Sequence, residues 1–159
     1  VWGRFWEHEN LTRAEQGLLL SAREHARSAL LTYGERQESF GLIHADLHPN
    51  NIVLKGTELG LLDFDDSAYG WHVYDMASAL VEYTTASDFE KLQAAMLDGY
   101  RRHRPLSDND IEILPLFLLI RGMAIIGWLH QRPEHAGSDY FVETKNWVIS
   151  KCDDRCYLG

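Results

Sequence analysis

Short strand-like segments interrupt an otherwise helical pattern between Gly41 and Asp75, and this interruption restricts the fold more than any other feature of the chain. The second and third of these segments are separated by a turn over 55–58, so we predict that they pair as a hairpin. Apolar residues repeat at helical spacing on both sides of the interruption. The strand candidates are 41–44, 51–55 and 60–63, and the helix candidates are 11–36, 73–83, 89–102, 111–131 and 139–151. The fold class predicted is therefore α+β and mainly α-helical.

Two of the predicted helices carry recognisable start signals. Thr12 is followed three residues later by Glu15, which is the pattern of a capping box. Ser107 or Asp108 could cap the helix predicted over 111–131. That segment is apolar on nearly every face, which predicts a central, buried helix.

The composition suits one globular domain over residues 1–159, with 45% apolar residues and a formal charge of -9. This charge argues against nucleic acid or an anionic membrane as the main partner, but not against phosphates, because a bound divalent cation can invert the local sign. We find no apolar run long enough to span a membrane and no signal peptide. We therefore expect a cytoplasmic protein in which Cys152 and Cys156 are reduced thiols. The sequence leaves the oligomeric state open.

Polar residues in the interrupted stretch have a spacing that points to chemistry. Asp46 and Asn51 lie five residues apart on the loop between two strand candidates, and Asp63 ends the apolar run after the hairpin turn. The hairpin should return Asp63 to the end where Asn51 lies. A carboxylate and an amide oxygen form a hard-oxygen ligand pair suited to Mg²⁺. Asp46 is then free to accept a proton from an attacking hydroxyl or to align it, and phosphoryl transfer needs these elements.

The same residues carry a resemblance to a known family. The string HADLHPNN at 44–51 resembles the catalytic loop of the aminoglycoside phosphotransferase and choline kinase family, whose members are related to the protein kinases. Its Asp-to-Asn spacing equals that of the protein-kinase loop. The string LLDFDD at 61–66 is similar to the family's metal-binding segment, with Asp65 where protein kinases carry glycine. The resemblance implies the C-terminal lobe of a kinase-like fold, with a small β-hairpin carrying the catalytic and metal-binding loops.

The resemblance also implies roles for individual residues. Asp46 would be the catalytic base or would orient the acceptor hydroxyl. Asn51 and Asp63 would hold Mg²⁺ and, through it, the co-substrate ATP. Asp75 would accept hydrogen bonds from the backbone of the catalytic loop near His44, which makes His44 a structural residue.

The family's N-terminal lobe has no counterpart in this sequence. Before residue 11 there is no Gly-rich phosphate loop, no Val-Ala-Ile-Lys-like strand and no partner glutamate. The resemblance thus covers a C-terminal lobe only, with the nucleotide-gripping lobe absent from this chain. We expect the 159 residues alone to be inactive or nearly so as a kinase. The choice between ATP and GTP stays open.

The resemblance implies that the partner is a small-molecule substrate with a hydroxyl group. The substrate class would be an aminoglycoside, a choline-like alcohol or a hydroxy-amino acid, because acidic side chains suit an amine-bearing acceptor. For any one of these side chains the competing interpretation is a solvated acid or a core residue. The candidates for the wall of the substrate pocket are Asp65, Asp66, Glu82, Arg121 and Trp128.

Three other functions compete with a small-molecule kinase. His44 and His48 could belong to a zinc site, although such a site needs further ligands. Asp63 and Asp65 match the Asp-x-Asp of haloacid-dehalogenase-type phosphatases, a fold that needs a parallel sheet after the motif. A catalytically silent kinase-like binding module is the third alternative. Mg²⁺-dependent nucleotide binding that is lost in Asp63→Ala would separate these possibilities.

Overall fold

We describe residues 3–154 and 157 in a computed structural model of the chain. Contacts divide the chain into two compact units. Residues 1–34 and 115–159 form the first, which we call the helical unit, and residues 35–114 form the second, which we call the mixed unit.

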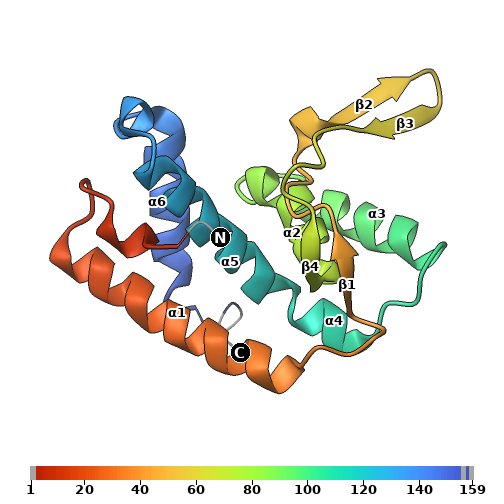
Figure 1. Cartoon of the computed structure of the whole chain (residues 1–159), viewed down its shortest axis with the longest axis horizontal. Helices are drawn as coiled ribbons and strands as arrows, with labels where there is room; N and C mark the ends of the chain where they lie inside the picture. The colour runs from red at the N-terminus through yellow and green to blue at the C-terminus, as the bar shows by residue number, and fades with distance from the viewer. Residues whose placement is uncertain (1–2, 155–156, 158–159) are drawn as a thin grey trace. The chain divides into compact units, whose positions relative to one another are not determined.

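The helical unit contains three long helices among the described residues, with one short 3-10 turn before the first helix and another between the second and the third (Figure 1). Its core is apolar, with Leu19, Phe117 and Phe141 almost completely buried. Cys152 is a buried free thiol, while Cys156 lies outside the described residues. The helices are α1 (Arg13–Tyr33), α5 (Leu114–His130) and α6 (Asp139–Lys151), and the 3-10 turns are Phe5–Glu7 and Pro133–His135.

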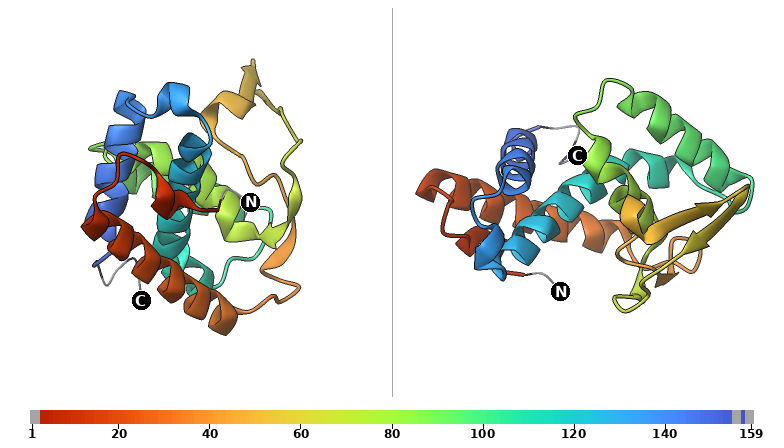
Figure 2. Two further views of the ribbon diagram at one scale, coloured as in Figure 1. Left: turned by 60° about the vertical axis from the view of Figure 1, so that its left-hand side comes forward. Right: turned by 90° about the horizontal axis from the view of Figure 1, so that it is seen from above.

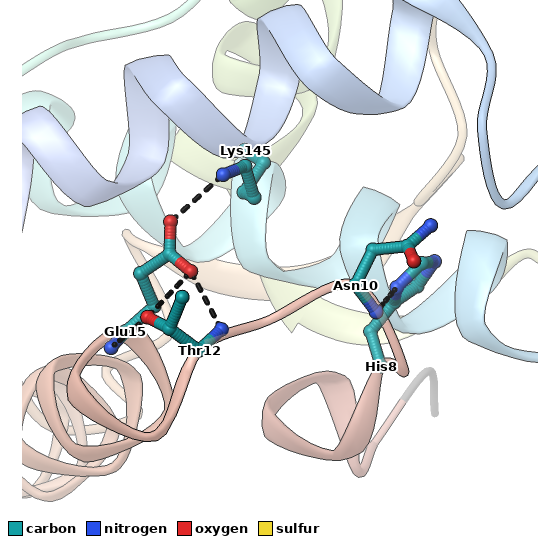
Figure 3. A network of polar contacts seen from close by, with 5 residues as sticks. All are labelled: His8, Asn10, Thr12, Glu15 and Lys145. Carbon is teal, nitrogen blue, oxygen red and sulfur yellow. Dashed lines mark hydrogen bonds and ion pairs between the residues drawn. The ribbon is translucent and has the colours of Figure 1, made fainter.

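A network of polar contacts joins the start of α1 to α6 (Figure 3). The capping box predicted from the sequence is confirmed, because Thr12 N donates to Glu15 Oε2 at 2.7 Å and Glu15 N donates to Thr12 Oγ1 at 3.3 Å. Lys145 Nζ donates to Glu15 Oε1 at 2.7 Å, and this bond does most to lower the pKa of Glu15 to about 2. Beside them, Asn10 N donates to His8 Nδ1 at 3.2 Å. Residues from both ends of the chain are thus tied together.

The single helix predicted over 111–131 is wrong in one respect. The structure has α4 (Asp108–Glu112), then a break at Ile113, and then α5 from Leu114. Proline disfavours helical geometry in the residue before it and lacks the backbone N–H that would continue the hydrogen-bond ladder. Pro115 therefore begins a new helix near its N-terminus instead of continuing the preceding one. Ser107 is the N-cap, and Asp110 completes its capping box.

Close packing of α5 against α6 depends on a residue without a side chain. A Cβ added at Gly122 would lie 2.6 Å from Val148 Cγ2 and 2.9 Å from Trp147 Cζ3. Both distances are shorter than real contacts of this kind, and Val148 is completely buried. The two helices can approach this closely only because residue 122 is glycine.

We predict that Gly122→Ala lowers the free energy of unfolding by about 1–2 kcal/mol, because an added methyl group overpacks the contact with α6. Gly17→Ala is the matched control, since Gly17 lies on α1 with no atom within 4 Å of the added Cβ. The free energy of unfolding of Gly17→Ala should rise by up to about 1 kcal/mol, because alanine has a higher helix propensity than glycine. Urea unfolding followed by circular dichroism measures both, and equal effects of the two substitutions would contradict the packing argument.

The mixed unit contains both sheets of the described chain, each made of two antiparallel strands (Figures 1 and 2). The predicted hairpin is confirmed: β2 pairs with β3 in the register Ile52↔Leu61 and Lys55↔Glu58. The first strand candidate does form β1, but it pairs with β4, a strand that we did not predict. The elements are β1 (Phe40–Ile43), β2 (Ile52–Lys55), β3 (Glu58–Leu61), β4 (Ala68–Trp71), α2 (His72–Leu80) and α3 (Phe89–Arg101).

Glycines let β1 and β4 pack tightly beside their neighbours. Gly41 and Gly70 face each other in the register of the pair. A Cβ at Gly70 would lie 2.5 Å from Ile43 Cδ1, and one at Gly41 would lie 2.8 Å from His72 Nε2. Because β4 leads directly into α2 and its last residue, Trp71, pairs with Phe40, this pairing places the start of α2 beside the start of β1.

Candidate active site

One carboxylate on α2 accepts hydrogen bonds from the backbone of the loop between β1 and β2, residues 44–51. Asp75 Oδ2 accepts a hydrogen bond from His44 N, and Asp75 Oδ1 accepts one from Ala45 N, both at 2.8 Å. Ala45 has φ 66°, which is the left-handed region that costs a non-glycine residue about 1–2 kcal/mol. Charge-assisted bonds from a single carboxylate to consecutive amides can offset that cost. Asp75 therefore fixes the backbone immediately before Asp46.

His44 connects this loop to the far end of the hairpin. It is buried, and its Nε2 lies 2.8 Å from the carbonyl oxygen of Leu62. Its Nδ1 accepts a longer hydrogen bond, 3.4 Å, from Asp46 N. An acceptor at Nδ1 requires the neutral tautomer with the proton on Nε2, which then donates to Leu62. Both ring nitrogens are thus engaged by the protein, which argues against His44 as a metal ligand.

Asp46 and Asn51 are in direct contact across the loop. The Nδ2 of Asn51 donates to the Asp46 carbonyl oxygen at 3.0 Å and to Asp46 Oδ2 at 3.3 Å. Asn51 is buried, and since its NH₂ group faces Asp46, its Oδ1 is left as an acceptor. His48 Nε2 lies 3.5 Å from the same Asp46 oxygen, too far for a strong hydrogen bond.

The hairpin brings the backbone of Asp63 close to that of Asn51. The pairing of Ile52 with Leu61 is extended by one hydrogen bond, in which Leu62 N donates to the Asn51 carbonyl at 2.9 Å. The next residue, Asp63, has φ 58°, so the chain turns sharply there. Its carboxylate is exposed and has no hydrogen bond or ion pair within the described part of the chain. A carboxylate and an amide oxygen are the kinds of ligand that a hard cation prefers.

The predicted substrate-wall residues fall in both units. Asp65, Asp66 and Glu82 are exposed side chains of the mixed unit. Arg121 is buried and Trp128 is half-buried in α5, which belongs to the helical unit apart from its first residue. Within that unit the guanidinium of Arg132 lies 3.9 Å from the centroid of the Trp128 ring. The ring of His135 stacks on Trp128 at 5.8 Å between centroids. A role for these residues in binding a substrate stays a prediction.

The family resemblance predicted the hydrogen bonds from the loop backbone to Asp75, but sequence reasoning missed the left-handed turn at Ala45 and the carbonyl of Leu62. Ala45 contributes a left-handed turn and an N–H, and Leu62 contributes a carbonyl; neither residue type indicates these roles. The only usable signal was the HADLHPNN string itself, because it resembles loops that need such a turn. The sequence suggested His48 as a ligand of the competing zinc site, whereas the structure places it next to the Asp46 carboxylate.

Two features are typical of a kinase-like phosphotransferase. The carboxylate of Asp75 on α2 holds the 44–51 loop, and the β2–β3 hairpin brings the chain at Asp63 back toward Asn51. Comparison with known proteins agrees: residues 3–106 match the model of the phosphotransferase enzyme family, and the chain belongs to that family.

The relatives and solved structures it matches include small-molecule kinases. A homoserine kinase of Chelativorans sp. is 36% identical over 78% of this chain and 39% of its own length. The structure of a microcompartment-associated aminopropanol kinase has a TM-score of 0.75 at 29% identity, covering 98% of this chain and 47% of that one. An amicoumacin kinase in complex with AMP-PNP, Ca²⁺ and Ami has a TM-score of 0.72 at 25% identity, covering 94% and 49%. The chain spans less than half the length of these proteins.

These likenesses confirm the predicted fold class, a mainly helical α+β lobe of the kinase-like type. Both sheets of the described residues are antiparallel, whereas the dehalogenase alternative needs a parallel sheet after Asp63. None of the helices within residues 3–154 and 157 is long and apolar enough to cross a bilayer.

Proposed function

We propose that the intact protein transfers the γ-phosphoryl group of ATP to a hydroxyl of a small molecule. The observation that carries this proposal is the hydrogen-bonded unit of Asp75, the 44–51 loop and the hairpin end, which gathers Asp46, Asn51 and the backbone of Asp63. Phosphoryl transfer asks the protein chiefly to position its reactants and to stabilise charge, so a rigidly held set of polar groups suits it.

Each polar side chain has a distinct part in this proposal. The Asp46 carboxylate accepts the proton of the acceptor hydroxyl or aligns that hydroxyl for attack on the γ-phosphorus. The Asn51 bond to Asp46 Oδ2 fixes the orientation of that carboxylate. Asn51 Oδ1 and the Asp63 carboxylate would hold a divalent cation, for which we propose Mg²⁺, and a bound cation would neutralise charge on the phosphates.

The hairpin and the residue that follows Asp63 carry exposed apolar side chains. Leu54 and Leu59 face each other across β2 and β3 and are 70% and 72% exposed, and Phe64 beside Asp63 is 56% exposed. Exposed apolar clusters of this kind often mark binding surfaces. We assign this surface to the base of the nucleotide, whose phosphates would then point toward Asp63.

The acceptor class is proposed as an amine-bearing alcohol, such as an aminoglycoside, a choline-like alcohol or a hydroxy-amino acid. The exposed acids Asp65, Asp66 and Glu82 of the mixed unit supply negative charge that suits an ammonium group. The matched relatives act, by their names, on homoserine, aminopropanol and amicoumacin. Incubating the intact protein with Mg-ATP and each alcohol, and detecting the phosphorylated product by mass spectrometry, would identify the acceptor.

We predict that Asp63→Asn weakens AMP-PNP binding at least tenfold when Mg²⁺ is present and has little effect when it is chelated, because the variant removes a charged cation ligand. Calorimetric titration of the intact protein measures both values. Glu58→Gln is the matched control, since it removes one exposed carboxylate from the same hairpin. If Asp63→Asn bound AMP-PNP like the wild type in Mg²⁺, residue 63 would have no part in holding the cation. Nucleotide binding without any phosphorylated product would favour the silent binding module.

A further inference from the structure

The mixed unit contains a pocket that the proposed reaction does not use. It has a volume of about 310 Å³ and lies between β1, α2 and α3. Neither Asp46, Asn51 nor Asp63 lines it. The pocket is lined by Leu42, Ile43, Leu47, His72, Asp75, Met76, Met96, Tyr100 and Arg104.

Its size and apolar lining suit a compact organic molecule. Small-molecule sites in proteins start at about 300 Å³ and combine an apolar wall with a few polar groups. The volume of 310 Å³ is about twice that of a dry cavity known to hold benzene, so a fused two-ring body fits. The side chains of Met76 and Met96 add a wall that can adapt to such a body, because methionine is flexible and polarisable.

The carboxylates at and near the pocket are engaged by hydrogen-bond donors of the protein, so a ligand would pair with the cation on the wall, Arg104. Both oxygens of Asp75 already accept backbone N–H groups, from His44 and Ala45. Asp110, whose charge also reaches Tyr100, accepts hydrogen bonds from the backbone and hydroxyl of Ser107.

The polar groups that remain on the pocket wall are donors or are neutral. The guanidinium of Arg104 is exposed and forms no ion pair or hydrogen bond within the described residues. Burial raises the pKa of Tyr100, so its hydroxyl stays protonated and can donate. Burial, and then the charge of Arg104, lower the pKa of His72, which favours its uncharged form.

We infer that this pocket binds a small carboxylate with a compact aromatic or alicyclic body, whose apolar part lies against Met76 and Met96 and whose carboxylate pairs with Arg104. Because the pocket wall includes Leu47 of the 44–51 loop and Asp75, which holds that loop, a bound ligand would contact the loop and its support directly. The inference does not rest on the proposed function, and its test uses neither nucleotide nor turnover.

The test compares 2-naphthoate with 2-naphthamide, which have the same shape and differ in charge. With methyl-¹³C methionine in the chain, naphthoate should shift the signals of Met76 and Met96 and leave that of Met123, which lies in the helical unit, unchanged. Binding of naphthamide should be at least tenfold weaker. A shift of all these signals together, or no shift at millimolar naphthoate, would overturn the proposed site.

Substitution of the arginine completes the experiment. Arg104→Gln should weaken the binding of naphthoate at least tenfold and leave the binding of naphthamide unchanged. Arg101 is an exposed arginine in the last turn of α3, outside the pocket, and Arg101→Gln should change the binding of neither compound. Circular dichroism checks that each variant is folded. If Arg104→Gln and Arg101→Gln weakened naphthoate equally, the attraction would come from general surface charge and the carboxylate assignment would be wrong.

Discussion

Replacing Asp46 with asparagine is expected to lower kcat for phosphoryl transfer by the intact protein roughly a thousandfold, in the range that a positioned general base contributes. Asparagine keeps the size of the side chain and can still contact Asn51, but it cannot accept the proton of the acceptor hydroxyl. The Kd for Mg²⁺ with AMP-PNP should change less than about threefold, because Asp46 is not among the proposed cation ligands. The substitution therefore removes an interaction that is made only in the transition state.

Asp98→Asn is the control for this prediction, because Asp98 is an exposed acid on α3 of the same unit. It should leave both kcat and Kd at their wild-type values. Coupled detection of ADP gives kcat, and calorimetry gives Kd. An Asp46→Asn protein that retained a tenth or more of the wild-type kcat would show that the proton is accepted elsewhere.

The second large effect is expected on stability. Asp75→Ala removes the acceptor of two hydrogen bonds of 2.8 Å and leaves the N–H groups of His44 and Ala45 unpaired in a part-buried place. Hydrogen bonds to a charged group contribute about 1.5–3 kcal/mol each, and not additively, so we expect a loss of about 3 kcal/mol in the free energy of unfolding. The left-handed backbone at Ala45 would lose its main restraint as well.

Two variants separate the hydrogen bonds from the charge. Asp75→Asn keeps one acceptor oxygen and should lose about half as much stability as Asp75→Ala. Asp98→Ala removes an exposed charge and should stay within about 0.5 kcal/mol of the wild type. Urea titration measures the stability, and hydrogen exchange of the His44 and Ala45 amides locates the change. Equal stability of Asp75→Ala and Asp98→Ala would mean that the bridge contributes nothing to folding.

The sequence predicted those elements whose pattern is local. The capping box at Thr12 and Glu15 needs only two residues three apart, and the β2–β3 hairpin needs only a turn between two short strands. β4 escaped prediction because residues 68–71 include a glycine and lead straight into a helix. The strand exists because Phe40–Ile43 offers it an edge, which is tertiary information.

The candidate site shows the same division. The spacing of Asp46, Asn51 and Asp63 is visible in the sequence, as is their chemistry. The Asp75 bridge was anticipated only through the family resemblance, because a carboxylate about 30 residues away gives no local sign of its partners. The pocket beside it was not anticipated at all, since its lining comes from β1, the following loop, α2, α3 and the residues after α3.

The pairing of β1 with β4 has a consequence for how the molecule reaches its native state. The β2–β3 hairpin lies inside the segment that this pairing closes, so the hairpin can form first from near neighbours. Asp75 reaches His44 only when the long segment has closed, and closing it costs chain entropy before any contact is gained. The arrangement of the candidate active site should consequently form late during refolding, after most of the helical circular dichroism signal has returned.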